Sequence, residues 1–409
     1  MKSICLYFRV HQPVRLQRFR FFDIGNSRYY YDDPQNEYQV QQVAQNCYLP
    51  TNKILLKLIK KYQGRFRLAF SISGTAIDQF QAYAPEVMDS FRELAFTGCV
   101  EFVAEPYASS LSALHDQDEF IRQVRMHVAA TESLFGARPS VFANTGLVYS
   151  DEIGAQVAEL GFKGMLAEGP RHILEWRSPN YLYSNAINPA LAVLLKNERL
   201  SDDIAFRFSD PNWSEWPLDA KKFVSWLNLL PQNEKMVNLF MDYETFGERQ
   251  KSQEGIFDFL SSLPGAVFRK SKFQFATPSE LISQFQPAAT LHVGHQTAHA
   301  GAQKWLGNEL QQEAFEKLYR LSGMVQDCHD KQVLKDWQYL QTSDHFFYMN
   351  TNYASGGDFQ AFHSPYGSPF DAFINYMNVL NDFTIRLEQF IQKEQQQYAD
   401  MKKKILEMA

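Results

Sequence analysis

The sequence of 409 residues is short of cysteine, of excess positive charge and of long apolar runs. Its four cysteines lie far apart without a Cys-x-x-Cys pair, which excludes a disulfide framework and a zinc-finger pattern. The net charge of −6 argues against general nucleic-acid binding. No run of about 18 apolar residues occurs, and the amino terminus lacks the features of a secretion signal. We therefore expect a cytoplasmic protein that binds neither nucleic acid nor membrane.

Aromatic residues, in contrast, are abundant: the chain has 34 Phe, 20 Tyr and 6 Trp. Disordered chains contain few aromatic residues, so this composition predicts a folded protein. The composition alone leaves two interpretations of these side chains. They fill a large core, or they form a site that stacks ring-shaped ligands.

Short apolar runs alternate with helical patterns over residues 1–286. Several runs are almost continuously apolar, which is typical of parallel strands buried on both faces. We expect strands at 3–10, 66–73, 99–104, 140–145, 162–167, 191–196, 236–243 and 272–276. We expect helices at 51–62, 83–97, 117–136, 150–160, 217–230, 254–263 and 278–286. This alternation favours an α/β fold with an irregular barrel over a doubly wound sheet.

The composition changes after residue 286. The segment 287–299 reads as a loop, and its three histidines lack the spacing of a metal-binding helix, so no metal site is expected. Helical patterns follow at 300–340 and 371–408, and the polar, aromatic segment between them is too long to be an idle loop. The sequence predicts a barrel domain at 1–286, a helical C-terminal domain at 287–409 and a site-covering loop at 341–370.

Polar residues stand where several expected strands end, and active sites of parallel α/β barrels gather at that end. His11 and Gln12 form either a simple turn or hydrogen-bonding groups at the barrel mouth. Glu105 has either a salt-bridge partner or a chemical task. Asp242 directly follows the apolar residues Leu239, Phe240 and Met241, and Glu244 is nearby, an environment that suits a general acid.

Taken together, nine segments resemble glycoside hydrolase family 57, and within it the α-amylase-like proteins. They are FRVHQP (8–13), CVEFVAEPY (99–107), VFANT with SDEIG (141–154), GFKGMLAEGP (161–170), SPNYLYS (178–184), DDIAFRFSD (202–210), FMDYETFGE (240–248), QTSDHFFYM (341–349) and SPFDAFINYMNVLNDF (368–383). The resemblance implies an incomplete (β/α)7 barrel followed by a helical region. It also implies action on α-glucans with retention of configuration, without a cofactor.

Retention requires two carboxyl groups, a nucleophile and an acid that later serves as base. The resemblance assigns the acid/base role to Asp242. It places the nucleophile in a segment that reads F-R-N-T-E in look-alike sequences, where this chain has Ala143 and Gly146 in place of the Arg and the Glu. Glycine has no side chain, so a covalent glycosyl intermediate cannot form there.

Other positions match the look-alikes only in part. Ser109 stands where a His is usual and His363 where an Asn is usual, whereas Asp344, His345 and Asp358 match. The candidate sugar-binding residues are His11, Gln12, Glu105, Tyr107, Glu168, Glu244, Asp344, His345 and Asp358. The expected ligand is an α-glucan or maltooligosaccharide, and the oligomeric state is left open.

Three hypotheses about function follow. The first is an α-glucan-recognising protein with very weak or absent hydrolysis. The second is an active α-amylase or 4-α-glucanotransferase that uses another carboxylate, for which Glu105 and Glu168 are the candidates. The third is a metal-dependent polysaccharide deacetylase, whose metal ligands would have to be His11, Asp242 and His345.

Overall fold

A computed structural model describes residues 2–408 except 170, 176, 327 and 353–363. The chain forms two compact units. The first comprises Met1–Gln12, Glu37–Ser109 and Ile121–Ala298, and the second comprises Pro13–Asn36, Ser110–Phe120 and His299–Ala409. Two segments from the first third of the chain belong to the second unit. The predicted domain boundary at residue 286 stays a prediction.

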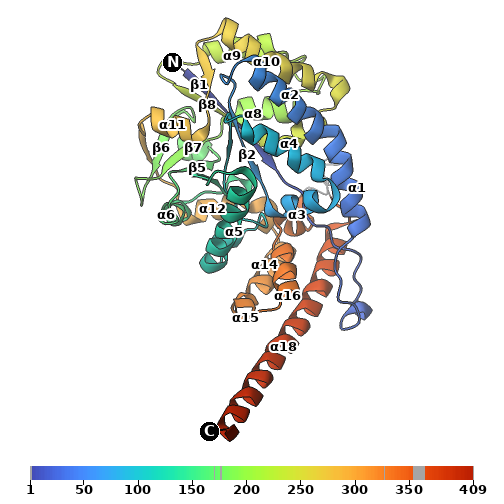
Figure 1. The fold of residues 1–409 in the computed structure, drawn as a ribbon. Coiled ribbons are helices and arrows are strands. Elements are labelled where there is room, and N and C mark those ends of the chain that lie inside the picture. Colours follow the sequence, from blue (N-terminus) through green and yellow to red (C-terminus); the bar gives the residue numbers. More distant parts are fainter. Residues whose placement is uncertain (1, 170, 176, 327, 353–363, 409) are drawn as a thin grey trace. The chain divides into compact units, whose positions relative to one another are not determined.

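Seven parallel strands form the barrel of the first unit (Figure 1). They are β1 (Lys2–Val10), β2 (Leu68–Ile72), β3 (Val100–Phe102), β4 (Val141–Ala143), β5 (Gly164–Ala167), β7 (Ala192–Leu195) and β8 (Met236–Asp242). One parallel run has the order β3-β2-β1-β8, and a second contains β4-β5-β7. A bridge between Ala104 and Phe142 joins β3 to β4, and the Asn197 amide donates to the Asn238 carbonyl to join β7 to β8. The predicted irregular (β/α)7 barrel is thereby confirmed.

Three further strands extend this arrangement. β9 (Phe273–Phe275) pairs with the start of β1. β6 (Leu182–Asn185) pairs antiparallel with β7, and β10 (Ala289–Leu291) pairs with β6. These additions lie outside the seven-stranded ring.

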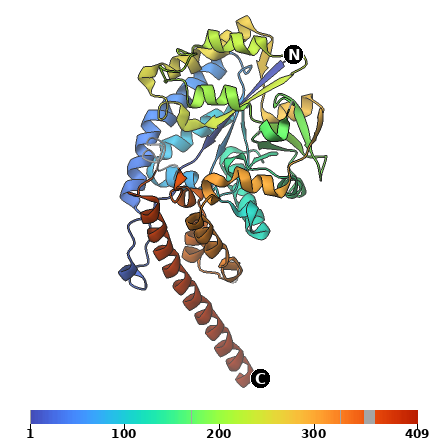
Figure 2. The same cartoon turned by 180° about the vertical axis from the view of Figure 1, so that it is seen from behind.

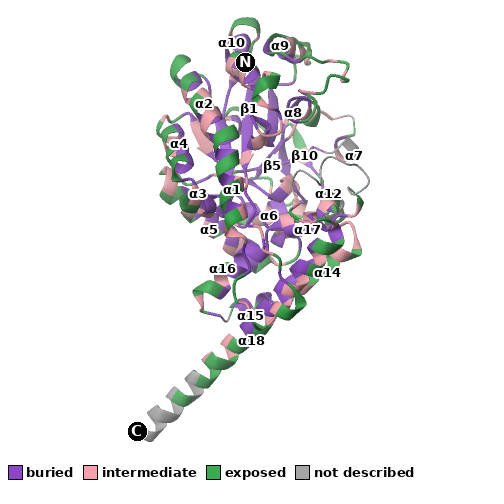
Figure 3. Cartoon of the chain, turned by 90° about the vertical axis from the view of Figure 1, so that its right-hand side faces the viewer, coloured by how far each residue is buried: buried purple, intermediate pink, exposed green. Residues whose placement is uncertain are grey.

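Helices cover the outside of the barrel (Figures 1 and 2). Those of the first unit are α2 (Leu49–Lys61), α3 (Gly74–Tyr83), α4 (Pro85–Phe96), α6 (Asp151–Glu159), α7 (Arg171–Leu174), α8 (Glu198–Ala205), α9 (Ala220–Leu229), α10 (Ile256–Lys270) and α11 (Pro278–Gln284). Figure 3 shows the strands buried, while the helices keep an exposed outer face. This pattern is why the strands read as nearly continuous apolar runs.

Alternation along each strand separates two cores. On β1, Leu6 and Phe8 face outward and pack in the cluster beneath the helices, whereas Cys5 and Tyr7 lie in the barrel interior. Because side chains alternate along a strand, the next inward residue is Arg9. The interior cluster therefore ends in charged groups at the carboxyl end of the barrel.

The second unit is helical. Its helices are α13 (Gln303–Leu306), α14 (Glu309–Tyr319), α15 (Ser322–Gln326), α16 (Lys331–Leu340), α17 (Ser343–Phe347) and α18 (Pro369–Met408), while α1 (Asp33–Val43), α5 (Gln117–Phe135) and α12 (His295–Gly301) include residues of both units. Trp337 is fully buried in this unit. Beside it Arg386 pairs with the buried Asp336, which also accepts a hydrogen bond of 2.6 Å from Tyr31 Oη.

The eight predicted strands are all present, and the helix predicted at 278–286 is α11, whose start is stabilised by a capping box between Thr277 and Glu280. The loop predicted at 287–299 was wrong, because β10 and α12 occupy most of it. The helical prediction for 300–340 was too coarse, since four short helices lie there. In the part of the chain that the structure describes, no helix is long and apolar enough to cross a membrane.

Candidate functional site

Charged side chains gather inside the barrel at the carboxyl ends of β1 and β8. These strands are neighbours, and Arg9 is in register with Asp242. Tyr7 and Phe240, two residues earlier on each strand, lie in the interior cluster, so alternation directs Arg9 and Asp242 inward. Arg9 Nη1 lies 3.9 Å from Asp242 Oδ1. The Asp242 side chain is 43% exposed, so the candidate acid/base is accessible at the barrel mouth.

The same guanidinium contacts a second carboxylate. Arg9 Nε lies 3.6 Å from Glu105 Oε2, and Arg9 donates a hydrogen bond to Ser109 Oγ. The Glu105 side chain is only 2% exposed, and its backbone amide donates to His127 Nδ1. Burial lowers the pKa of His127, which suits a neutral ring that accepts this bond. Arg9 thus links Glu105 to Asp242.

Asp242 has a second positive neighbour. Arg249 Nη2 lies 3.3 Å from Asp242 Oδ2, and the guanidinium lies over the Phe206 ring, 4.7 Å from its centroid. The Arg249 amide also donates to the Glu244 carbonyl, which fixes the loop after β8. Two positive charges beside a carboxylate stabilise its negative charge. The arrangement therefore presents Asp242 as an acceptor for hydroxyl groups.

Glu244 belongs to a separate hydrogen-bonded chain. It accepts from Tyr48 Oη, which in turn accepts from Gln12 Nε2 at 2.8 Å. The Gln12 carbonyl accepts from Gln79 Nε2 at 2.9 Å. Burial, followed by the nearby negative charge of Asp242, raises the pKa of Glu244 to about 7. A carboxyl group that holds a proton near neutral pH thus lies two residues after Asp242.

His11 and Tyr107 are held by residues that follow β2. His11 Nδ1 lies 2.8 Å from Ser73 Oγ, and Tyr107 Oη donates to Asp78 Oδ1 at 2.8 Å. The Tyr107 ring lies directly against Gly74, where an added Cβ would be 2.1 Å from Tyr107 Cδ1. A glycine at the start of α3 is therefore required for this position of the ring.

The turn after β4 contains Gly146, the position at which the resemblance predicted a missing nucleophile. Gly146 has φ +60°, a left-handed conformation that residues with a side chain rarely adopt. Asn144 fixes the turn, since its Oδ1 accepts from the Thr145 amide and its Nδ2 donates to the Val148 carbonyl. Ala143 is almost fully buried in the barrel interior. Leu147 has φ +58°, so two consecutive residues of this turn are left-handed, and Gly146 is the one that adopts this conformation without a steric cost.

Glu168 lies beside this turn. It follows β5, its side chain is exposed, and its amide donates to the Leu147 carbonyl at 3.2 Å. Leu166, two residues earlier, lies in the interior cluster, so alternation places Glu168 on the inward side. Glu168 is thus connected to the turn that contains Gly146 by its backbone amide, and its own carboxylate is exposed on the inward side.

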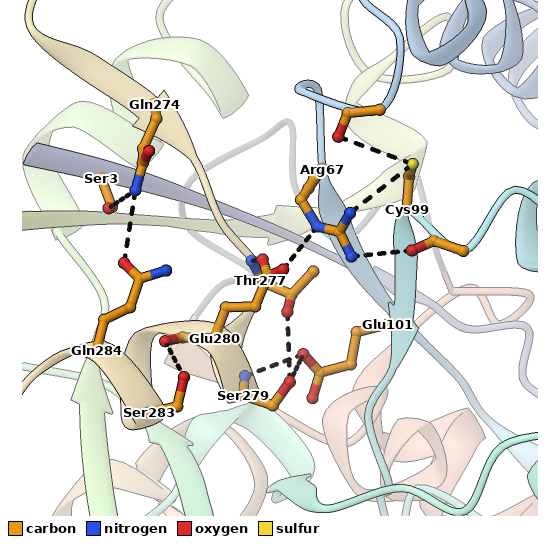
Figure 4. Close-up of polar contacts among 12 residues, drawn as sticks. Ser3, Arg67, Cys99, Glu101, Gln274, Thr277, Ser279, Glu280, Ser283 and Gln284 are labelled. Carbon is orange, nitrogen blue, oxygen red and sulfur yellow. Dashed lines mark hydrogen bonds and ion pairs between the residues drawn. The ribbon is translucent and has the colours of Figure 1, made fainter.

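Glu101, which shares a strand face with Glu105, has a structural role (Figure 4). Its Oε2 accepts from the amide and the hydroxyl of Ser279 at the start of α11, at 3.0 and 2.8 Å. On the same helix Glu280 pairs with Arg67 at 2.8 Å. Burial raises the pKa of Glu101. This carboxyl fastens α11 to the barrel at a level below the mouth.

The remaining candidates belong to the second unit. His345 is buried on α17, where its Nε2 lies 3.1 Å from the Tyr339 carbonyl and burial lowers its pKa to about 4. The ring packs against Tyr376 with centroids 5.4 Å apart. Asp344 is partly exposed on the same helix, and Asp358 lies outside the described residues together with the rest of segment 353–363 of the predicted covering loop. Contact of these residues with sugar stays a prediction.

No group of three His, Cys, Asp or Glu side chains within the described residues is placed to hold a metal ion. His11 and Asp242 belong to the first unit and His345 to the second. The structure thus offers no observation in favour of the deacetylase hypothesis.

Sequence reasoning missed Arg9, Arg249 and Tyr48 as parts of this site. Arg9 was detectable, because it lies two residues after Tyr7 and ends the inward face of a predicted strand. Tyr48 ends a short π-helix (Ala44–Tyr48) between α1 and α2, and its hydrogen bond to Glu244 forms only in the folded chain. Arg249 belongs to the loop after β8 and carried no distinguishing signal.

Comparison with known proteins identifies the family. The family model described as glycosyl hydrolase family 57 matches residues 5–294. The chain belongs to this family. A protein of Methanocaldococcus jannaschii named "Putative alpha-amylase" is 36% identical over 410 residues, covering 96% of this chain and 86% of that protein.

Solved structures support the fold. The family 57 branching enzyme of Pyrococcus horikoshii is similar with a TM-score of 0.68 at 14% identity, covering 96% of this chain and 91% of that one. The α-amylase AmyC of Thermotoga maritima has a TM-score of 0.66 at 14% identity, with 97% and 96% covered. For the 4-alpha-glucanotransferase of Thermococcus litoralis the TM-score is 0.63 at 16% identity, with 84% and 56% covered.

Proposed function

We propose that this protein recognises an α-glucan or maltooligosaccharide at the carboxyl end of the barrel and hydrolyses it very slowly or not at all. Family membership and the relatives named for action on α-glucans support the ligand class. The loss of hydrolysis rests on the arrangement of the mouth: Asp242 lies between two guanidinium groups, and the turn after β4 contains Gly146, which has no side chain.

The chemistry follows from these two features. A retaining glycosidase needs a nucleophile that attacks the sugar and an acid that protonates the leaving oxygen. Gly146 supplies no nucleophile, and Arg9 and Arg249 stabilise the charged form of Asp242. Hydrogen-bonding groups nevertheless remain at the mouth, among them His11, Glu244 and Asp242. A site with acceptors and donors but without the catalytic pair binds sugar more readily than it cleaves it.

The test measures binding and turnover on the same preparation. Isothermal titration with maltotriose should show saturable binding, and a chromogenic maltoside should give no turnover above background. Asp242→Asn should weaken binding and leave that background rate unchanged. Ordinary enzymes turn over at roughly 1–1000 s⁻¹. A rate in that range that disappears in the Asp242→Asn variant would contradict the proposal.

A second candidate function is an active α-amylase or 4-α-glucanotransferase that uses Glu105 as the second carboxylate. It is favoured by the contact of Glu105 and Asp242 with the same Arg9 guanidinium. Glu105→Gln and Glu168→Gln separate the possibilities. Turnover lost only in the Glu105 variant would support this candidate, whereas an unchanged rate in that variant would exclude it.

We also place the protein in the cytoplasm. Its four cysteines are free and buried, which is the usual state of thiols in a reducing compartment. Detection of the protein in a secreted or periplasmic fraction would contradict this placement.

A further inference from the structure

A cavity of about 550 Å³ lies at the amino end of the barrel, opposite the candidate site. It is bounded by the last residues of α9 and α10 and by the first residues of β1 and β9. Figures 1 and 2 show the amino terminus beside the helices at this end. The nine residues of β1 separate the cavity from Asp242 by roughly 25 Å, so the cavity is not part of the sugar site.

The charge of this cavity has one sign. Five cationic residues line it, namely Lys2, Lys235, Arg269, Lys270 and Lys272. Its described lining includes no Asp or Glu, although the chain as a whole has a net charge of −6. Clustered charges of one sign around a concave surface concentrate counter-ions there.

Capping of helix ends accounts for only part of this cluster. Cations near a helix C-terminus commonly hydrogen-bond its last carbonyls. Here Lys2 Nζ donates to the Leu230 and Pro231 carbonyls after α9, at 2.9 and 2.7 Å. At the end of α10, Asn228 Nδ2 donates to the Lys270 carbonyl at 2.8 Å. These capping bonds use Lys2 and Asn228, and none of them involves the side chains of Arg269, Lys270 or Lys272.

Those three cations are the unexplained part of the cavity. Arg269, Lys270 and Lys272 are exposed, and within the described residues their charged groups make no hydrogen bond or ion pair. Three positive charges within four residues repel one another. An anion that contacts all three would relieve this repulsion and gain charge-assisted hydrogen bonds.

We propose that this cavity binds a small phosphorylated molecule carrying at least two negative charges. Phosphoryl oxygens match guanidinium and ammonium donors, and three separate cations fit more than one phosphoryl group. The cavity volume lies within the range of sites for small ligands, which is roughly 300–1,000 Å³. This inference is independent of the proposed sugar site.

The test uses the full chain and two matched triple variants. Arg269→Gln, Lys270→Gln and Lys272→Gln together remove three charges from the cavity. Lys53→Gln, Lys57→Gln and Lys60→Gln remove three exposed charges from α2. Both variants have the same net charge, and thermal unfolding of each shows whether it is folded.

Titration calorimetry with inorganic pyrophosphate at physiological ionic strength gives the readout. The cavity variant should bind about tenfold or more weakly than the natural chain. The α2 variant should bind within about twofold of it. If the triple cavity variant does not fold, the Lys272→Gln single variant is used in its place, and it should also bind pyrophosphate more weakly than the natural chain. Equal losses in both triple variants, no binding by the natural chain, or preference for a single-stranded oligonucleotide would overturn the proposal.

Discussion

The left-handed backbone at Gly146 allows a prediction about the stability of variants that place a carboxylate at this position. Gly146 has φ +60°, and in this region a residue with a Cβ costs roughly 1–2 kcal/mol relative to a right-handed or extended conformation. We expect Gly146→Glu to lower the free energy of unfolding by about 1 kcal/mol, and Gly146→Ala to lower it similarly. The cost belongs to the backbone, so it does not depend on the charge of the new side chain.

The assay is thermal unfolding followed by circular dichroism. For a unit of this size, about 1 kcal/mol corresponds to a Tm decrease of roughly 2–4 °C. Gly294→Ala is the control, because Gly294 has no left-handed φ and an added Cβ would meet nothing within 4 Å. That variant should keep or slightly raise the Tm, since alanine restricts the unfolded chain.

One result would refute the reasoning. If Gly146→Ala and Gly146→Glu unfold at the temperature of the natural chain or above it, then a side chain at position 146 has no backbone cost. An arginine at position 143 should be more destabilising still, because Ala143 is 1% exposed inside the barrel and a long charged side chain would overpack this site. The double variant Ala143→Arg, Gly146→Glu should therefore have a lower Tm than the Gly146→Glu single variant and than the natural chain.

Three further predictions concern other parts of the molecule. Because the pKa of Glu244 is about 7 in the folded chain against 4.5 for the free group, the folded state holds the proton more tightly, and stability should fall as the pH rises from about 4.5 to 7. Glu244→Gln should remove this decline, which amounts to roughly 1–2 kcal/mol after allowance for partial exposure; equal pH dependence of the two proteins in urea unfolding would contradict it. Gly74→Ala should displace the Tyr107 ring and cost roughly 1–3 kcal/mol, because the added Cβ would lie 2.1 Å from that ring, and an unchanged Tm and unchanged maltotriose binding would show the contact to be unimportant. Asp336→Ala should cost about 3–5 kcal/mol by leaving Arg386 buried without its partner, whereas Glu316→Ala in an exposed pair on α14 should cost about 0.5 kcal/mol or less; equal effects in guanidinium unfolding would count against the buried pair.

The sequence predicted the barrel well for a physical reason. Its strands are buried on both faces, so each reads as an apolar run that stands out from its surroundings. β6 and β10 were missed because they are only four and three residues long and include polar residues, Ser184 and Asn185 in β6 and Thr290 in β10. Neither strand therefore forms a continuous apolar run. α1 was missed because its sequence, DPQNEYQVQQV, has too few apolar residues for a clear helical period.

The positions of the candidate site residues were predictable where they lie at strand ends and unpredictable where they depend on tertiary contacts. Asp242 ends β8 and Glu105 follows β3, and alternation along these strands predicts that both side chains point inward. The contact of Tyr48 with Glu244 joins residues 196 positions apart, which no local pattern encodes. The glycine at position 146 was visible in the sequence, but its left-handed backbone conformation was not.

A structure with bound maltotriose tests the central claim most directly. The measured quantity is the distance from the Asp242 carboxylate to any other carboxylate across the sugar. Retaining catalysis requires a separation of about 5–5.5 Å with the second group facing the anomeric carbon. We predict bound sugar with Asp242 accepting hydroxyl hydrogen bonds and no carboxylate on the opposite face. A Glu105 or Glu168 carboxylate at that separation, aimed at the anomeric carbon, would contradict the account.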